Sequence, residues 1–260
     1  MRIAIGLEYR GSGFCGWQSQ PQGCGVQDAV EAAVAAIVGR KTAVTAAGRT
    51  DTGVHAALQV AHFDVSVERP LTAWVRGVNS HLPSGVAVLW AREVGEDFHA
   101  RFAATQRGYR YVLLNHAVRP GLNDGLIGWH HRPLDADAMN RAVAHLIGQH
   151  DFSAFRAAEC QAKSPVKELR RALVERRGDY LLCDFQADGF LHHMVRNLMG
   201  SLIQVGAGVQ PPEWMAELLA SRDRTRAAPT FEAAGLYLTH IRYPAHFALP
   251  ESSDRWPFAI

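Results

Sequence analysis

The residues of this chain whose types and spacing could do chemistry are concentrated in "AGRTDTGVHA", Ala47 to Ala56. Glycines permit the positive φ angles of a tight turn, and an aspartate side chain can bond nearby backbone, so one interpretation is purely structural. The other is chemical. Arg49 and Asp51 are two residues apart, so an extended backbone would aim both to one side, where the cation would keep the carboxylate ionised. An ionised carboxylate in a pocket can act as a nucleophile, a base or a metal ligand.

The metal interpretation would combine Asp51 with His55 and His62. The spacing of these residues fits no ligand motif, the H-E-x-x-H helix pair is absent, and the adjacent Arg49 would repel a divalent cation. The chain also lacks G-x-S-x-G, the P-loop pattern and the dinucleotide fingerprint G-x-G-x-x-G. We therefore expect chemistry without a metal and without an organic cofactor.

A second stretch, "FHARFAATQRGYRYVLLNH", favours binding of nucleic acid. It interleaves rings with guanidinium groups, which can stack on bases and neutralise phosphates, and each stacked base is worth about 1–3 kcal/mol. Aromatic residues of strands also pack in cores, so both interpretations stay open. The net charge of +2 and the pI of about 8.4 neither require nor exclude a polyanionic partner. The basic residues are nevertheless clustered, most densely in "KSPVKELRRALVERR".

The composition is that of an ordinary globular protein, with 260 residues, 48% of them hydrophobic and 20% charged. Alternating or helically spaced apolar residues predict strands and helices interleaved at short spacing. The expected strands are 3–10, with one buried face, 42–47, 58–67, 85–94, 105–115 and 235–244, with a hairpin over 168–187 that turns at Arg177-Gly178-Asp179; the expected helices are 26–38, 71–78, 135–147, 190–205 and a short one after Pro211-Pro212. The order of elements repeats loosely. This favours an α+β fold of two pseudo-duplicated halves, at 1–104 and 105–260, whose antiparallel sheets join into one extended sheet.

The four cysteines indicate neither a zinc site nor a disulfide framework, because no C-x-x-C pair and no short Cys/His spacing occurs among Cys15, Cys24, Cys160 and Cys183. Reduced thiols are the expectation. The start of the chain, "MRIAIGLEYRG", alternates instead of forming the apolar core of a signal, and no apolar run is long enough to span a membrane. We expect a cytoplasmic protein.

Six ordered segments resemble the tRNA pseudouridine synthase A family over nearly the whole chain. They are "YRGSGFCGWQSQP", "AGRTDTGVHA", "FHARFAATQRGYRY", "DFSAFRAAECQAKSP", "GFLHHMVRN" and "AAPTFEAAGLYL". The resemblance implies an isomerase that converts uridine to pseudouridine in the anticodon stem-loop of tRNA, at positions 38, 39 and 40, without cofactor or metal, and that acts as a homodimer. It also implies that the helices pack on one face of the extended sheet and that the fold has a central RNA-binding cleft. Two residues depart from the pattern: Arg10 stands where an aspartate is common, which leaves the first loop less defined, and Thr52 stands where an alanine is common.

The resemblance also implies roles for individual residues. Asp51 matches the catalytic aspartate, Arg196 of "HHMVRN" matches its basic partner, and Tyr109 matches the tyrosine that packs on the target uracil. Arg49 matches a residue that contacts tRNA and helps to hold the nucleotide out of its stack, and Leu236 matches the apolar floor under the base. The segments that match RNA contacts are Phe98, His99, Ala100, Arg101 and Phe102, and Glu159, Cys160, Gln161, Ala162 and Lys163.

Residue chemistry alone leaves several alternatives open. An arginine early in the apolar helix 190–205 can reach to water with its charged end, or it can be the buried partner of Asp51. The aspartate can attack the sugar, attack the base or take a sugar proton. The competing functions are a non-catalytic RNA-binding module, which would have no use for Asp51, and a metal-dependent hydrolase built on Asp51 and the nearby histidines.

Overall fold

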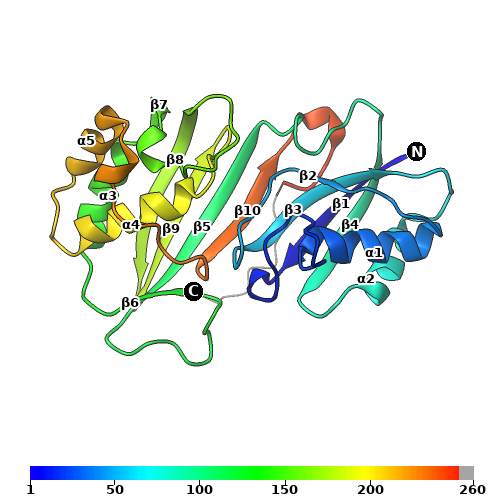
Figure 1. Cartoon of the computed structure of the whole chain (residues 1–260), viewed down its shortest axis with the longest axis horizontal. Helices are drawn as coiled ribbons and strands as arrows, with labels where there is room; N and C mark the ends of the chain where they lie inside the picture. Colours follow the sequence, from blue (N-terminus) through cyan, green and yellow to red (C-terminus); the bar gives the residue numbers. More distant parts are fainter. Residues whose placement is uncertain (252–260) are drawn as a thin grey trace. The chain divides into compact units, whose positions relative to one another are not determined.

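The computed structural model describes residues 1–251, and the contacts among them divide the chain into two compact units. Of the described residues, unit 1 comprises Met1–Gln106 and 237–251, and unit 2 comprises Arg107–Leu236. The labels of their helices and strands are those of Figure 1. The domain boundaries expected from the sequence, between residues 104 and 105, stay a prediction.

The strands of unit 1 run in the order β4-β1-β3-β10, with the short strand β2 beside β3. Their bounds are β1 Arg2–Tyr9, β2 Thr45–Ala46, β3 His55–Asp64, β4 Val86–Val94 and β10 Leu236–Arg242. Strand β1 is antiparallel to both β3 and β4, whereas β10 runs parallel to β3. The first strand of the chain, the strand that follows the Asp51 turn and the last strand therefore build one sheet segment.

Strand β1 corrects one expectation. Its alternating sequence predicts one buried face, but both faces are covered: Ile3 and Ile5 are fully buried, and so is Ala4 between them. The cause lies at Gly6, where an added Cβ would come 2.2 Å from the indole of Trp90. The indole of Trp90, on the neighbouring strand β4, thus covers the face of β1 where Ala4 and Gly6 have small or no side chains.

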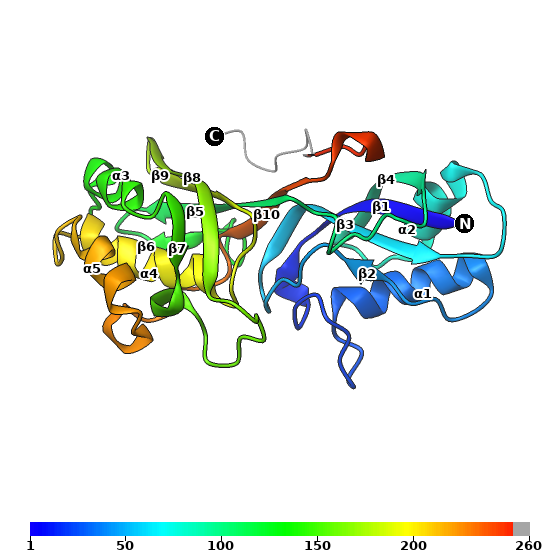
Figure 2. The same cartoon turned by 90° about the horizontal axis from the view of Figure 1, so that it is seen from above.

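The helices of unit 1 are α1, Val26–Val38, and α2, Val78–His81, and they pack against each other. Helix α1 has the predicted bounds and stops at Gly39, whose φ of 82° is the left-handed conformation that ends helices. It lies alongside the unit 1 sheet (Figure 2). Helix α2 follows a wide helical turn over Ala73–Gly77, and the helical residues begin at Leu71 as predicted but continue to His81, beyond the predicted end at Val78.

Unit 2 has the strand order β5-β9-β8-β7, all antiparallel, with β6 parallel to β5. The bounds are β5 Gln106–Asn115, β6 Gly128–His130, β7 Gly148–Asp151, β8 Val166–Arg177 and β9 Tyr180–Ala187. The predicted hairpin is confirmed, because β8 and β9 pair directly and Gly178 in their turn has a φ of 59°. Together with unit 1, these strands confirm an α+β fold rich in antiparallel pairs.

Three helices complete unit 2: α3 Ala136–Ala144, α4 Met194–Gly206 and α5 Trp214–Ser221. They pack against one another, and α3 also contacts β8 (Figure 1). Helix α4 begins later than the predicted residue 190 because His193 at its start has a φ of 60°, which is incompatible with a continuous helix. No helix within residues 1–251 is long and apolar enough to cross a membrane.

The expectation of reduced thiols is wrong for one pair. Cys15 and Cys24, whose Cα atoms are 5.4 Å apart, form a disulfide. The backbone brings them together, because the Cys15 amide donates to the Cys24 carbonyl at 2.9 Å. A pair nine residues apart in an irregular loop carries no spacing signal, which is why the sequence did not indicate it. Cys160 and Cys183 are free thiols.

Candidate active site

Asp51 of unit 1 lies in a turn between β2 and β3 and is half-buried. The turn is closed by the Val54 amide, which donates to the Asp51 carbonyl at 3.1 Å, and Gly53 supplies the positive φ of 80° that the turn requires. On the other side, Thr50 shares a 2.8 Å hydrogen bond with the Tyr9 hydroxyl of β1. Burial raises the pKa of Tyr9 to about 12, so this hydroxyl stays protonated and the bond persists.

The first loop of the chain supports the same turn by close backbone contact. The Trp17 amide donates to the Thr50 carbonyl at 2.9 Å. A Cβ on Gly16 would lie 2.8 Å from that carbonyl, and one on Gly11 would lie 2.0 Å from the Val54 carbonyl. The glycines of "GSGFCGW" therefore allow two loops to touch without side chains between them. Backbone contacts therefore hold Asp51 in place, in addition to any partners of its carboxylate.

The histidines near Asp51 are used for packing. His55 is buried, stacks on Tyr237 with ring centroids 4.6 Å apart, and accepts a 3.0 Å hydrogen bond on Nδ1 from the Gly11 amide. His62 accepts from the Ala100 amide in the same way, at 3.2 Å. Within the part of the chain that the structure describes, Asp51, His55 and His62 do not bring their ligand atoms together.

The segment 98–102, also in unit 1, divides into an anchor and an exposed tip. Phe98 and Ala100 are buried, whereas Arg101 is exposed and 76% of the surface of Phe102 is accessible. The Phe102 ring stacks on His99 with centroids 4.3 Å apart, and the Arg101 guanidinium lies 5.6 Å from its centre. An exposed ring backed by a second ring and a cation is suited to stacking on a base.

Unit 2 carries Tyr109 on β5 and Arg196 in the first turn of α4. The Tyr109 ring meets Phe190 edge to face, with centroids 5.1 Å apart. The Arg196 side chain is half-buried, and its Nε donates to the Phe231 carbonyl at 2.8 Å. Leu236 is buried, with 4% of its surface accessible. An aromatic ring, a guanidinium and an apolar side chain are the groups expected around a uracil and an anion.

Comparison with known proteins decides between these interpretations. A family model described as tRNA pseudouridine synthase matches residues 6–103 and 142–244. A tRNA pseudouridine synthase A of Thiobacillus denitrificans is 82% identical over 259 residues, which cover 100% of both chains. That of Dechloromonas aromatica is 59% identical over 254 residues, 98% of this chain and 97% of the relative. The chain belongs to the tRNA pseudouridine synthase family.

Membership in the tRNA pseudouridine synthase family confirms the resemblance, and the enzymes of this family are isomerases that act on tRNA. Both matched ranges contain residues singled out above: Asp51 and 98–102 fall in the first, Glu159–Lys163 and Arg196 in the second. Tyr109 lies between the two ranges. The individual roles of these residues, and the pairing of Asp51 with Arg196, stay predictions.

The segment 159–163 of this family member is an irregular loop of unit 2 held by one arginine. The Arg156 guanidinium donates to the carbonyls of Cys160 at 2.6 Å and Ala162 at 3.0 Å. The Cys160 thiol accepts from the His192 amide at 3.3 Å. Glu159, Gln161 and Lys163 point outward and are exposed. The loop thus presents a lysine beside two polar side chains.

Sequence reasoning missed two groups that hold the candidate site. One is the Tyr9–Thr50 bond, and the other is a buried network around Asn197, directly after Arg196. Asn197 has no accessible surface, although it lies in a helix of the apolar pattern. The signal was present as an asparagine on the buried side of α4, because a buried amide must find hydrogen-bond partners.

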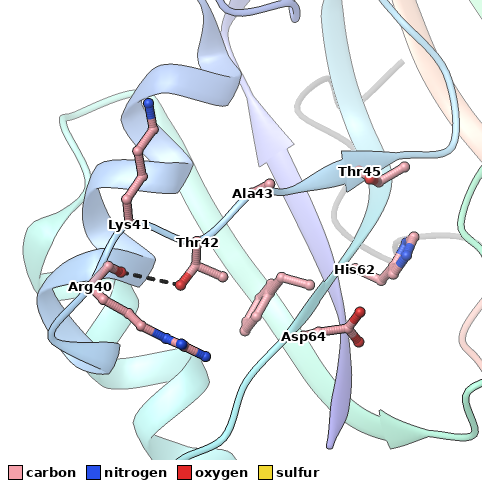
Figure 3. A pocket seen from close by; sticks show the side chains of 8 residues that line it. Arg40, Lys41, Thr42, Ala43, Thr45, His62 and Asp64 are labelled. Atoms are coloured by element: carbon pink, nitrogen blue, oxygen red, sulfur yellow. Dashed lines mark hydrogen bonds between the residues drawn. The ribbon is translucent and has the colours of Figure 1, made fainter.

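Unit 1 also contains a pocket of about 300 Å³ beside β2, shown in Figure 3. Its lining residues are Arg40, Lys41, Thr42, Ala43, Thr45, His62, Phe63 and Asp64. Several of its polar groups already have partners, because the Asp64 carboxylate is bound by Arg2 at 2.8 Å and the Thr42 hydroxyl donates to the Arg40 carbonyl at 3.2 Å. We assign no ligand to this pocket.

Proposed function

We propose that this protein isomerises uridine to pseudouridine in the anticodon stem-loop of tRNA, with Asp51 as its catalytic carboxylate. The observation that carries the proposal is the identity of 82% with a tRNA pseudouridine synthase A along the whole chain. The uridines at positions 38, 39 and 40 of tRNA are the proposed targets. A homodimer in the cytoplasm is the proposed form of the enzyme, and light scattering in solution tests the dimer.

The isomerisation requires the enzyme to keep the uracil bound after its bond to the ribose has broken. The bond from N1 of uracil to C1′ of the ribose breaks, the base turns while bound, and C5 bonds to C1′; the hydrogen of C5 leaves as a proton, and N1 takes up a proton. A carboxylate can stabilise or attack the electron-poor sugar carbon, attack the base, or remove a sugar proton. We propose Asp51 for this task, Arg196 as the basic partner of its carboxylate, and Tyr109 as the ring packed on the uracil, with Leu236 beneath it.

The target must also leave its stack, which costs a few kcal/mol. We propose that Arg49, exposed two residues before Asp51, helps to hold the flipped nucleotide. The exposed members of 98–102 and of 159–163 are proposed to contact the tRNA. The stacked pair His99 and Phe102 supports this, because such a pair loses no packing when a base covers it.

The test is release of tritium from unmodified tRNA labelled at C5 of uridine. With chelator present, the wild-type protein is expected to release tritium, and Asp51→Asn is the matched control that keeps the shape of the side chain. An RNA-binding module would bind tRNA without release. A metal-dependent hydrolase would cleave RNA, and would lose that activity in chelator.

A further inference from the structure

Helix α4 and the segment Ala227–Phe231 of unit 2 fit together closely. At Gly200 an added Cβ would lie 2.1 Å from the Pro229 carbonyl, so only glycine permits this approach. The Phe231 amide donates to the Arg196 carbonyl at 3.1 Å, and the Arg196 Nε donates back to the Phe231 carbonyl at 2.8 Å. Residue 231 is thus bound to Arg196 through both its backbone groups.

The bond from Nε fixes the direction of the guanidinium. The guanidinium is planar, so anchoring Nε sets the plane in which the two Nη groups lie. Two-point binding of a carboxylate depends on that plane. Any movement of the Phe231 carbonyl would therefore turn the face that Arg196 presents.

Thr230, the neighbour of Phe231, is held by a network around the buried Asn197 side chain. The Asn197 Nδ2 donates to the Phe155 carbonyl at 2.8 Å. Its Oδ1 accepts from the Thr230 hydroxyl at 2.7 Å and from an Nη of Arg224 at 3.0 Å. Asparagine has both a donor and an acceptor here, and an aspartate in its place would lack the donor that Phe155 requires.

Arg224 strengthens the network without an acidic partner in it. It donates to three neutral oxygens: Asn197 Oδ1, the Thr230 hydroxyl at 3.2 Å and the Ala227 carbonyl at 3.2 Å. Burial lowers the pKa of Arg224 from its ordinary value, but a guanidinium keeps its charge. A partly desolvated cation bound to neutral acceptors holds them firmly, because charged hydrogen bonds are the stronger kind.

We propose that Asn197, Arg224 and Thr230 are positioning residues for the reaction: they fix the Phe231 carbonyl and, through it, the orientation of the Arg196 guanidinium. This inference rests on the proposed function, in which Arg196 is the basic partner of the catalytic carboxylate. None of the three residues needs to touch the substrate.

The experiment compares Thr230→Val with Thr230→Ser. Valine keeps the shape of the side chain and removes the hydroxyl that bridges Asn197 and Arg224, whereas serine keeps the hydroxyl. We expect Thr230→Val to lower kcat by between about tenfold and a hundredfold, as small misplacements of catalytic groups do, with the Kd for tRNA unchanged and Thr230→Ser near wild type. Thr225→Val is the matched control: it removes a hydroxyl from the adjacent turn that binds only the Asp223 carboxylate, at 2.7 Å.

A second measurement does not depend on activity. The NMR signal of the Arg196 Nε–H, assigned by its loss in Arg196→Lys, is expected to exchange with solvent at least about tenfold faster in Thr230→Val than in Thr230→Ser. Unchanged exchange overturns the positioning network. Faster exchange with an unchanged kcat overturns its place in the reaction. A wild-type protein that binds tRNA and releases no tritium overturns the proposed function alone, while the exchange rates still decide the network.

Discussion

Asp51 lies in a turn that backbone groups of unit 1 hold in place, whereas Arg196 lies on a helix whose surroundings are fixed by side chains of unit 2. Around Asp51, the close contacts come from Gly11 and Gly16 and from amides that donate to carbonyls. Around Arg196, they run through the amide of Asn197 to residues far away in the sequence. Unit 1 thus positions its residue through glycines that let backbones touch. Unit 2 positions its residue through hydrogen bonds to a buried side chain.

The difference predicts how each region responds to substitution. A backbone-held turn tolerates changes of side chain and fails when a glycine gains a Cβ. A network of side chains fails when one member loses a donor or an acceptor, since the others are then left buried and unsatisfied. The experiment on Thr230 tests the second kind of region.

The largest effect is expected from the charge that the turn carries. Asp51→Asn should lower turnover by more than about a thousandfold, because the amide is neither a nucleophile nor a base, while tRNA affinity stays within a few-fold because phosphate contacts lie elsewhere. Adding Arg196→Met should lower turnover little further, since Arg196 is proposed to act through the Asp51 carboxylate. Single-turnover kinetics measure both variants, with Asp124→Asn on an exposed loop as the control. If the double variant instead loses turnover by the product of the two single-variant factors, the two residues act independently, and the proposed pairing is contradicted.

The next effect concerns His62, which holds the anchor of segment 98–102 through the Ala100 amide. Burial, with the charge of Arg2 and the neighbouring His99, lowers the pKa of His62 from 6.5 to about 4, while Asp64 opposes the shift. The unfolded state therefore binds a proton first as the pH falls. Stability from this residue is full above about pH 6.5 and is lost progressively toward pH 4, by up to about 3 kcal/mol.

Urea unfolding at a series of pH values measures that loss. His62→Asn keeps an acceptor for the Ala100 amide but cannot titrate, so its stability should depend less on pH across this window. His116→Asn, on an exposed loop, should retain the wild-type profile. If His62→Asn and wild type fall in parallel, another group is responsible.

A smaller effect is expected from the bond between Cys15 and Cys24 in the loop that supports the turn. Closing this short stretch restricts the unfolded chain, so replacing both residues by serine should lower the free energy of unfolding by roughly 2 kcal/mol. Wild type in excess reductant should lose about as much, and the double variant should not respond to reductant. Identical melting temperatures of wild type with and without reductant would contradict the prediction.

The smallest effect separates two glycines on either side of Asp51. Gly53 has a φ of 80°, where an alanine is strained, whereas Gly48 has no atoms within 4 Å of an added Cβ. Gly53→Ala should therefore destabilise the protein by about 1–2 kcal/mol, and Gly48→Ala should leave it nearly unchanged. Thermal unfolding of the two variants measures this difference. Equal shifts in melting temperature would contradict the prediction.

The sequence predicted the parts of this molecule that rest on local rules. Helix α1 and its stop at Gly39 follow from apolar spacing and a glycine, and the β8–β9 hairpin follows from alternation around Gly178. The turn around Asp51 was also predictable from a local rule, because glycines flank the aspartate. The second covered face of β1 was not predictable, since it depends on where Trp90 lies across the sheet.

The supports of the candidate site were less predictable than the site itself. Asp51 and Arg196 are found by their family motifs, but the partners of Asn197 come from Phe155, Arg224 and Thr230, and no local pattern joins these positions. The Cys15–Cys24 pair is similar, because its formation depends on a loop conformation without regular structure. Tertiary hydrogen bonds decide such contacts, and a single sequence does not reveal them.

The parallel pairing of β10 with β3 has a consequence for biosynthesis. Tyr237 pairs with His55 and stacks on its ring, and Tyr243 donates a 2.7 Å hydrogen bond to the Ala100 carbonyl. The ribosome makes residues in order, at about 5–20 per second, so all of Arg107–Leu236 emerges before these partners exist. Synthesis of the unit that carries Asp51 therefore begins first and ends last. For several seconds of each translation event, the edge of β3 and the buried residues of segment 98–102 lack the partners that the end of the chain supplies.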